Sequence, residues 1–241
     1  MTPREPTEHL HRPPDSTPAT GDPATNREKT LEEIQSVYAD YADWLHRLDW
    51  VDRALTGRYR RRRFGDADGR VLDVACGTGT NFRYLPASVD LVGIDISSDM
   101  LQKAAATLGD LGRKGTLRQM DAQALAFPDD SFDTVISALS TCTFPDPTAA
   151  LREMERVCKP EGRMLLVEHG KSDIGVVARY QEWRSEAHYA KMGCRWTQEP
   201  LDVVEAAGLT VRSVDTGGLG MITSMEIVPD DTERERDSGD G

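Results

Sequence analysis

Several features that mark specialised classes of protein are scarce or missing in this sequence. Of its 241 residues only 6% are aromatic and four are cysteines. No apolar run approaches the ~20 residues that a membrane-spanning helix needs, and the polar N-terminus lacks the apolar segment of a secretory signal. The cysteines have no C-x-x-C spacing and the five histidines have no zinc-ligand spacing. We therefore expect reduced, mostly buried cysteines, no metal site and a cytoplasmic location.

Positive charge is also in short supply. The chain has 41 acidic and 29 basic residues, which gives a formal net charge of -12. A phosphate backbone is normally bound by a basic face, so this balance argues against a nucleic-acid substrate. The basic residues cluster from Arg58 to Arg63. We interpret this cluster as a solvated helix end, and the alternative is a peripheral contact with an anionic membrane.

The length fits one domain with two tails. Residues 1–29 are rich in proline, threonine and aspartate, and residues 229–241 are acidic, so we expect both tails to be disordered. Residues 30–228 would form the domain. Within it, residues 30–64 carry apolar side chains at helical spacing, which predicts two helices with a break near Asp49 or Gly57.

From residue 70 onward the sequence alternates between strand and helix patterns. Strands are predicted near 70–75, 90–95, 115–120, 132–138, 162–168, 209–215 and 220–227. Helices are predicted near 80–85, 98–108, 147–158, 177–191 and 198–207. This alternation is typical of an α/β fold, with a mostly parallel sheet covered by helices on both faces. A ligand would then lie beyond the carboxyl ends of the strands.

A glycine-rich turn follows the first of these strands, in residues 71–81 (VLDVACGTGTN). Gly77 and Gly79 would let a ligand approach bare backbone, and Asp95 ends the next strand. A glycine turn with a second-strand carboxylate is typical of nucleoside binding. Phe82 stands where a dinucleotide site needs its third glycine, so S-adenosylmethionine (SAM) fits better, and a nicotinamide oxidoreductase is the weaker alternative.

Four sequence blocks resemble those of the class I SAM-dependent methyltransferases, in the same order. They span residues 71–81, 93–101, 120–133 and 151–163. The likeness is strongest to the branch that holds ubiquinone/menaquinone C-methyltransferases, phospholipid N-methyltransferases and the methyltransferase-like 7 thiol methyltransferases. The chain departs from the family pattern at Ala75, where the first glycine is expected, and at Glu161 in the usual Lys-Pro-Gly-Gly turn.

The resemblance implies a Rossmann-like, seven-stranded, mostly parallel sheet with an antiparallel C-terminal edge hairpin. It implies SAM as methyl donor and S-adenosylhomocysteine (SAH) as product. Asp95 would bind the ribose hydroxyls and Asp121 the adenine amino group. The cofactor-binding positions carried over from the family are Asp73, Ala75, Gly77, Gly79, Asp95, Ile96, Met100, Asp121, Ala122, Ser137 and Leu139.

The resemblance also places the acceptor. Residues 30–64 would be cap helices that cover the cofactor, and residues 171–196 an acceptor lid. Methyl transfer needs a general base only if the acceptor must lose a proton. The candidates are Glu168 and His169, at the end of the fifth strand. His169 is preferred because imidazole titrates near neutral pH, and the alternative is a structural histidine that caps the turn.

The sequence leaves the acceptor open. A small molecule or lipid fits the family. A thiol fits Glu168, His169 and residues 192–197, which resemble the thiol enzymes in particular. A SAM-binding protein without catalysis, acting as a sensor or assembly partner, is an alternative of another class. The acceptor atom and the oligomeric state cannot be derived from these motifs.

Overall fold

The computed structural model describes residues 28–229. The two tails that we expected to be disordered lie outside these residues, apart from positions 28, 29 and 229. Among the described residues, no helix combines the length and the apolar character needed to cross a membrane.

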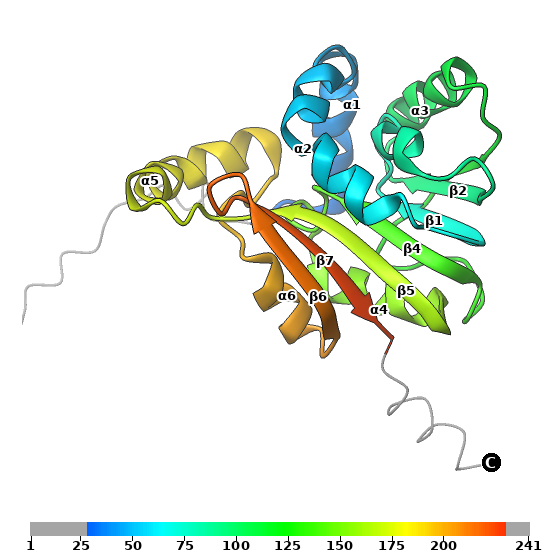
Figure 1. Cartoon of the computed structure of the whole chain (residues 1–241). Coiled ribbons are helices and arrows are strands. Elements are labelled where there is room, and N and C mark those ends of the chain that lie inside the picture. Colours follow the sequence, from blue (N-terminus) through cyan, green and yellow to red (C-terminus); the bar gives the residue numbers. More distant parts are fainter. Residues whose placement is uncertain (1–27, 230–241) are drawn as a thin grey trace, which may run out of the picture.

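Within the described chain, seven strands form one sheet in the order β3-β2-β1-β4-β5-β7-β6 (Figure 1). The first five strands of that order are parallel, while β7 runs antiparallel to both β5 and β6. The predicted α/β fold and its antiparallel edge hairpin are confirmed. The strands are β1 (Arg70–Val74), β2 (Asp90–Asp95), β3 (Thr116–Gln119), β4 (Phe132–Ala138), β5 (Cys158–His169), β6 (Thr210–Gly217) and β7 (Ile222–Val228).

The helices pack on both faces of the sheet through buried apolar side chains. Along β5, Met164 and Leu166 belong to one buried cluster, and Leu165 and Val167 belong to the other. Successive side chains of a strand point to opposite faces, so each face has its own core. One face packs against α4 (Pro147–Val157) and α6 (Pro200–Ala206), and the other against α3 (Ser98–Asp110) and the 3₁₀ helix η1 (Thr80–Tyr84).

Local capping explains where several helices begin. The Ser97 side chain accepts a hydrogen bond from the backbone of Met100 and starts α3. Asp146 does the same for Ala149 at the start of α4, where Pro147 occupies the first helical position. Both arrangements satisfy backbone N–H groups that the first turn of a helix leaves unpaired. They fix helices directly after the loops at the carboxyl ends of β2 and β4.

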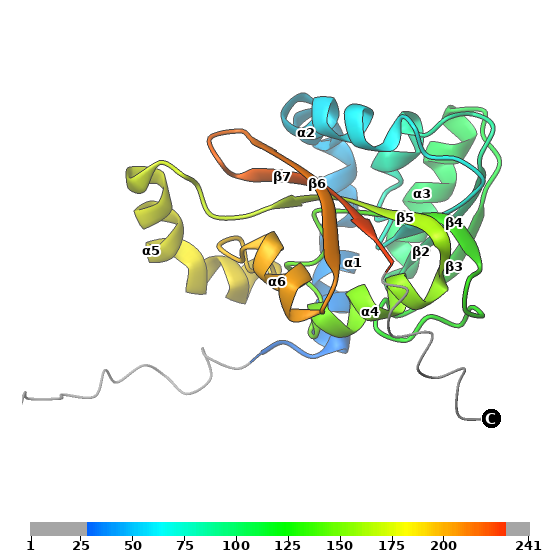
Figure 2. The same ribbon diagram turned by 60° about the horizontal axis from the view of Figure 1, so that its bottom comes forward.

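Two helices cap these loops, as predicted. They are α1 (Leu31–Arg47) and α2 (Asp49–Phe64), and the chain bends between them at Leu48. The break therefore lies at the first of the two predicted positions. Gly57 instead lies inside α2, where a Cβ would be 2.8 Å from the hydroxyl of Tyr84. Figures 1 and 2 show both helices over one end of the sheet, and α5 (Gly175–Met192) standing out beside β6 and β7.

The basic cluster at the end of α2 divides into inward and outward side chains. Arg63 donates to the hydroxyls of Ser213 and Ser224 at 2.9 Å each, and it also pairs with Asp215. Its side chain is only 9% exposed. Arg60 is buried as well, whereas Arg58, Arg61 and Arg62 are exposed. The predicted solvated helix end therefore holds for the exposed members only, and the alternative of a membrane contact would rest on these same residues.

Replacing Arg63 by alanine should lower the free energy of unfolding by about 2–3 kcal/mol, because hydrogen bonds to a charged group would be lost between α2 and the β6–β7 hairpin. Arg61→Ala removes the same charge at an exposed position and should change stability by less than about 0.5 kcal/mol. Urea unfolding of both variants measures the contrast. Equal losses would contradict this account of the cluster.

Candidate functional site

A cavity of about 530 Å³ lies between the cap helices and the sheet. Its walls come from α1 and α2 on one side and from the ends of β1, β2, β4 and β5 on the other. This is the edge where parallel α/β sheets bind ligands, and the volume suits a small molecule. Predicted site residues that line the cavity are Ala75, Gly77, Asp95, Ile96, Met100, Asp121, Ala122, Leu139 and His169.

The two glycines of the turn after β1 serve different purposes. A Cβ on Gly77 would meet nothing within 4 Å, and Gly77 lines the cavity. Its missing side chain therefore leaves room for a ligand against the backbone. A Cβ on Gly79 would lie 2.5 Å from the ring of Phe82, so this glycine permits packing of the turn onto η1. Gly79 does not line the cavity, and its predicted contact with the cofactor would be indirect.

Backbone strain is concentrated at this site. Among the described residues, four that are not glycine have a positive φ, and two of them line the cavity: Ala75 at 52° and Leu139 at 56°. A left-handed conformation costs roughly 1 kcal/mol for a residue with a Cβ. Ala75 is also the position where the family pattern has glycine, and its conformation explains that preference. Strained residues of this kind cluster at binding and catalytic sites.

Asp95 joins the glycine turn to the start of α3. One carboxylate oxygen accepts from the N–H of Gly77 at 2.9 Å, and the other accepts from the N–H of Ser97 at 2.9 Å. Burial raises the pKa of this carboxyl, while these backbone donors oppose the shift. A carboxylate has about four lone-pair sites, so this group has acceptor capacity beyond its bonds to Gly77 and Ser97. The residue that shapes the turn can thus also accept two hydroxyl donors.

Asp121 lies in the neighbouring wall, just after β3. Its carboxylate is oriented by the backbone N–H of Gln123 at 2.9 Å and by the Gln123 side chain at 3.1 Å. Ala122 is buried beside it, and Met100 is buried in the first turn of α3. The cavity therefore has a polar acceptor next to an apolar surface, which suits the amino edge and the flat face of a purine.

A buried polar network, which the sequence analysis missed, closes the other end of the cavity. Arg60 of α2 is 3% exposed. It donates to the Asn81 side chain, to Thr56 at 3.0 Å and to Asp52 at 2.9 Å. Asn81 in turn donates to Asp73 of β1 at 2.9 Å. The run of arginines concealed Arg60, because periodicity alone does not show which member of such a run turns inward.

Asp73 lies beneath the cavity rather than in its wall. It is completely buried, and one of its carboxylate oxygens has no hydrogen-bond partner among the described residues. Burial raises the pKa of Asp73 to about 7, against the opposing effects of Asn81 and Arg60. Ser137 is likewise buried, and its hydroxyl donates to the carbonyl of Val74. As the structure stands, these two predicted cofactor residues support the turn and do not line the cavity.

Glu168 does not reach the cavity either. Its carboxylate is buried and accepts from the N–H of Ser140 at 3.0 Å. Burial raises its pKa to about 7, although His169 and the hydrogen bonds to residues 140 and 141 oppose the shift. The geometry assigns Glu168 to holding the loop after β4, which corrects the expectation that it faces the acceptor.

His169 lines the cavity, and its Nε2 is already engaged. Nε2 lies 3.2 Å from the sulfur of Cys142 and 3.2 Å from that of Cys194, and the ring also hydrogen-bonds the backbone of Trp196. Burial alone would lower the pKa of His169, but the Cys194 thiol and the Glu168 carboxylate raise it overall. Its predicted role as a base stays a prediction. The contacts with Cys142 and Cys194 occupy Nε2, one of the two nitrogens that could take a proton.

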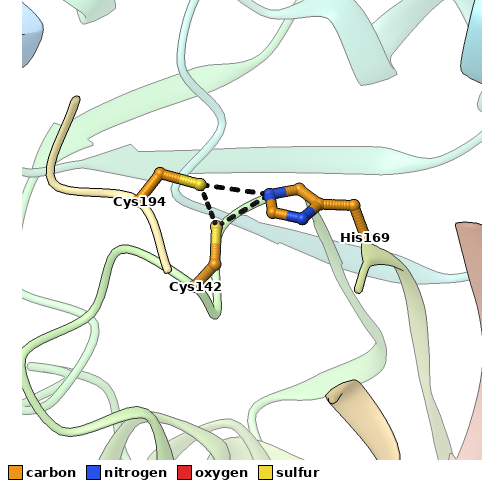
Figure 3. A group of neighbouring side chains, drawn as sticks. All are labelled: Cys142, His169 and Cys194. Atoms are coloured by element: carbon orange, nitrogen blue, oxygen red, sulfur yellow. Dashed lines mark hydrogen bonds between the residues drawn. The ribbon is translucent and has the colours of Figure 1, made fainter. Parts of the chain in front are cut away.

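The contact between Cys142, His169 and Cys194 was not expected from the sequence (Figure 3). The sequence predicts scattered, buried cysteines and no metal site. Spacing along the chain gave no sign of the contact, since its members lie in three different segments. Cys76 and Cys158 are buried in the two cores, in keeping with the prediction.

The predicted acceptor lid, residues 171–196, has a less direct role than expected. None of these residues, all of which the structure describes, lines the cavity. The segment approaches the site only near its C-terminal end, where Cys194 contacts His169 and Tyr189 accepts from the backbone N–H of Lys29 at 2.8 Å. The apolar wall of the cavity comes instead from the cap helices. Its residues include Leu31, Ile34, Tyr38, Leu45, Leu48, Val51 and Leu55.

These features fit SAM. Gly77 offers open space against the backbone, Asp95 places a carboxylate in the cavity wall, and Asp121 is oriented beside an apolar surface. Arg60 has N–H groups beyond the three that bond Thr56, Asn81 and Asp52. It lines the cavity and is the kind of buried cation that a methionine carboxylate would need.

Comparisons with known proteins agree with this arrangement. Residues 72–166 match a family described as a methyltransferase domain. The chain is 38% identical to a phosphatidylethanolamine N-methyltransferase of Cereibacter sphaeroides over 155 residues, which cover 62% of this chain and 76% of that protein. It is 35% identical to a ubiquinone/menaquinone biosynthesis C-methyltransferase of Geobacter sulfurreducens, covering 57% of this chain and 58% of that protein.

Solved structures show the same fold. A SAM-dependent methyltransferase of Thermotoga maritima superimposes with a TM-score of 0.62 and 18% identity, over 82% of this chain and the whole of that one.

The pKa of Asp73 gives a testable consequence for stability. An aspartate in an unfolded chain titrates near 3.9, whereas folded Asp73 titrates at about 7. Between these values the unfolded state loses its proton and the folded state keeps it, so this residue costs more stability as the pH rises. Asp73→Asn cannot ionise. Its stability relative to the wild type should therefore rise from pH 4 to pH 7, by roughly 4 kcal/mol at most.

Urea unfolding of both proteins across this pH range measures the difference. The other buried acids, Glu168 included, are common to both proteins and cancel. A difference that does not change with pH would show that Asp73 is ionised throughout.

Proposed function

The chain belongs to the SAM-dependent methyltransferases, and we propose that it methylates an amphiphilic, lipid-like acceptor. The observation that carries this proposal is the apolar wall that α1 and α2 add to the cavity. Leu31, Ile34, Leu45, Leu48 and Val51 face it from the cap helices. A polar cofactor does not need such a wall, but the hydrocarbon part of an acceptor does.

When bound, SAM supplies an electrophilic methyl group for in-line displacement by the acceptor. We assign to Asp95 the ribose hydroxyls, to Asp121 the adenine amino group and to Arg60 the methionine carboxylate. Gly77 would contact the ligand through its backbone. These residues orient the cofactor, and the cap helices exclude water from the reacting atoms. Holding two reactants in a near-attack geometry removes much of the entropic barrier.

Tyr38 belongs to the acceptor side of the cavity. It lies on α1, and burial raises the pKa of its hydroxyl well above the usual value, together with the charges of Cys142, Cys194 and Asp95. The hydroxyl therefore stays neutral and can donate a hydrogen bond to a polar acceptor group. We propose that Tyr38 helps to orient this group, and that general-base catalysis by His169 is needed only for acceptors that must lose a proton.

The rim of the cavity favours an acceptor that comes from a membrane. Trp44 and Leu55 line the cavity and are 51% and 67% exposed, and Trp50 between them in sequence is 63% exposed. Arg58 and Arg61 lie further along α2 and are also exposed. Aromatic side chains and cations of this kind suit the boundary between lipid headgroups and hydrocarbon. The similarity to a phosphatidylethanolamine N-methyltransferase supports a headgroup amine as the acceptor.

The cofactor assignment predicts the effect of Asp95→Asn on SAH binding. An amide keeps one acceptor oxygen and loses the charge, so it cannot serve Gly77, Ser97 and two ribose hydroxyls together. Affinity for SAH in calorimetric titration should fall by roughly 10- to 100-fold. Asp99→Asn changes a nearby exposed acid in the first turn of α3 and should leave affinity within a few-fold. Unchanged binding by Asp95→Asn would overturn the assignment.

The acceptor proposal predicts that the double variant Trp44→Ser and Trp50→Ser sediments less with vesicles that contain anionic lipid. Methylation of phosphatidylethanolamine in those vesicles should show a higher KM, while SAH affinity stays within a few-fold. Trp183→Ser removes a tryptophan that is 74% exposed on α5 and serves as the matched control. Equal effects of the two changes would argue against the α1–α2 rim.

The functions that the sequence left open can be distinguished by measuring how much SAH the protein produces from SAM with different acceptors. Turnover with phosphatidylethanolamine or a quinol precursor supports the proposal. Turnover with small thiols alone would instead support a thiol S-methyltransferase. SAH binding without turnover on any of these acceptors would favour a SAM-binding protein that is not an enzyme.

A further inference from the structure

Two thiols and an imidazole meet at the edge of the cavity (Figure 3). Cys142 follows β4, His169 ends β5, and Cys194 follows α5. The two sulfurs are 3.3 Å apart, and each lies 3.2 Å from Nε2 of His169. All three atoms point to a common centre, although their residues come from segments up to 52 positions apart in sequence.

Backbone contacts hold these donors in place. The N–H of Arg195 donates to the carbonyl of Cys142 at 2.9 Å, which fastens the segment after α5 to the loop after β4. Gly193 ends α5 in a left-handed conformation immediately before Cys194. The His169 ring is fixed by its hydrogen bond to the backbone of Trp196. In metal sites a hydrogen bond at one ring nitrogen commonly orients the imidazole, and the other ring nitrogen binds the metal.

We propose that Cys142, His169 and Cys194 bind a soft divalent cation, of which Zn²⁺ is the best match. Zinc prefers thiolate and imidazole ligands, at about 2.3 Å from sulfur and about 2.0–2.1 Å from nitrogen. Tetrahedral angles then place two sulfurs about 3.8 Å apart and a sulfur and a nitrogen about 3.6 Å apart. The observed separations are a few tenths of an ångström shorter, so a small expansion of the cluster would admit the ion.

Charge balance in the cluster also suits a cation. The two sulfurs are only 3.3 Å apart, and two adjacent thiols do not both ionise without a compensating charge. A divalent cation supplies that charge, and the thiol protons are released to solvent when the metal binds.

His188 supports Cys194 from α5. It lies beside Cys194, and its ring stacks on Trp196 with centroids 4.2 Å apart. It is not among the three residues whose donor atoms all lie within 4.8 Å of one another. We therefore assign it to positioning Cys194. Three protein ligands leave the fourth position of a tetrahedral ion open, which is the arrangement of zinc sites that bind water or a substrate.

Cobalt binding to the full-length, reduced protein tests the proposal. Co²⁺ is a spectroscopic substitute for Zn²⁺, and thiolate ligation gives a charge-transfer band in the near ultraviolet. We expect one equivalent of Co²⁺ to bind, with visible absorption of tetrahedral intensity, and Zn²⁺ to displace it. Elemental analysis of protein loaded with zinc and then desalted should find one zinc per chain.

Variants then assign the ligands. Cys142→Ala and Cys194→Ala should each abolish the band and weaken Zn²⁺ binding at least ~100-fold, while His188→Ala should weaken it by about 10- to 100-fold, as for a residue that positions a ligand. Cys158→Ala removes a buried cysteine elsewhere in the core and should bind zinc normally. Circular dichroism confirms folding, and SAH titration separates loss of the metal site from loss of the methyltransferase site.

Two results would overturn the proposal. One is zinc binding that survives in both the Cys142→Ala and Cys194→Ala variants. The other is failure of the folded, reduced wild type to bind Co²⁺ or Zn²⁺. In that case, if exposure to air removed two free thiols from the wild type but not from the Cys142→Ala or Cys194→Ala variant, the two cysteines would be identified as a disulfide pair instead. A protein that binds zinc but not SAH would refute the cofactor assignment and leave the metal site standing.

Discussion

The buried guanidinium of Arg60 determines how the cap helices meet the sheet. It is a cation removed from water, and such a charge is tolerated only with good partners. Asp52 and Thr56 provide them within α2, and Asn81 provides one from η1. Through Asn81 the network continues to Asp73 at the end of β1. The position of α2, and with it the apolar wall of the cavity, is therefore coupled to the glycine turn.

Strain in this turn is balanced by the hydrogen bonds around it. Ala75 and Leu139 both adopt left-handed conformations at the ends of adjacent strands. Asp95 fastens the turn through Gly77, and the N–H of Cys76 donates to the carbonyl of Ile94 at 2.8 Å. The loop after β4 is held by Glu168. Buried carboxylates thus support the two strained positions, and the cavity exposes backbone that regular secondary structure would have hidden.

The sequence was sufficient for the parts of this molecule that depend on local pattern. Strand and helix alternation predicted the sheet, and the glycine turn and Asp95, which the sequence predicted to share a ligand site, line one cavity. Sequence patterns did not predict the contacts between segments that are far apart in the chain. The direction of Arg60 follows from the packing of α2, and the meeting of Cys142 with Cys194 follows from the path of α5. Neither leaves a periodic signal. Glu168 was placed at the correct strand end, but alternation along β5 turns it away from the cavity.

The two proposed sites share His169, and this constrains the chemistry of the acceptor. With Nε2 between two sulfurs and its other contact to the backbone of Trp196, the imidazole could accept a proton from an acceptor only by giving up a hydrogen bond. An acceptor that already carries a free lone pair, such as a neutral amine or a thiolate, needs no such exchange. The geometry therefore favours an enzyme that works by positioning, in which the apolar wall of α1 and α2 selects the acceptor.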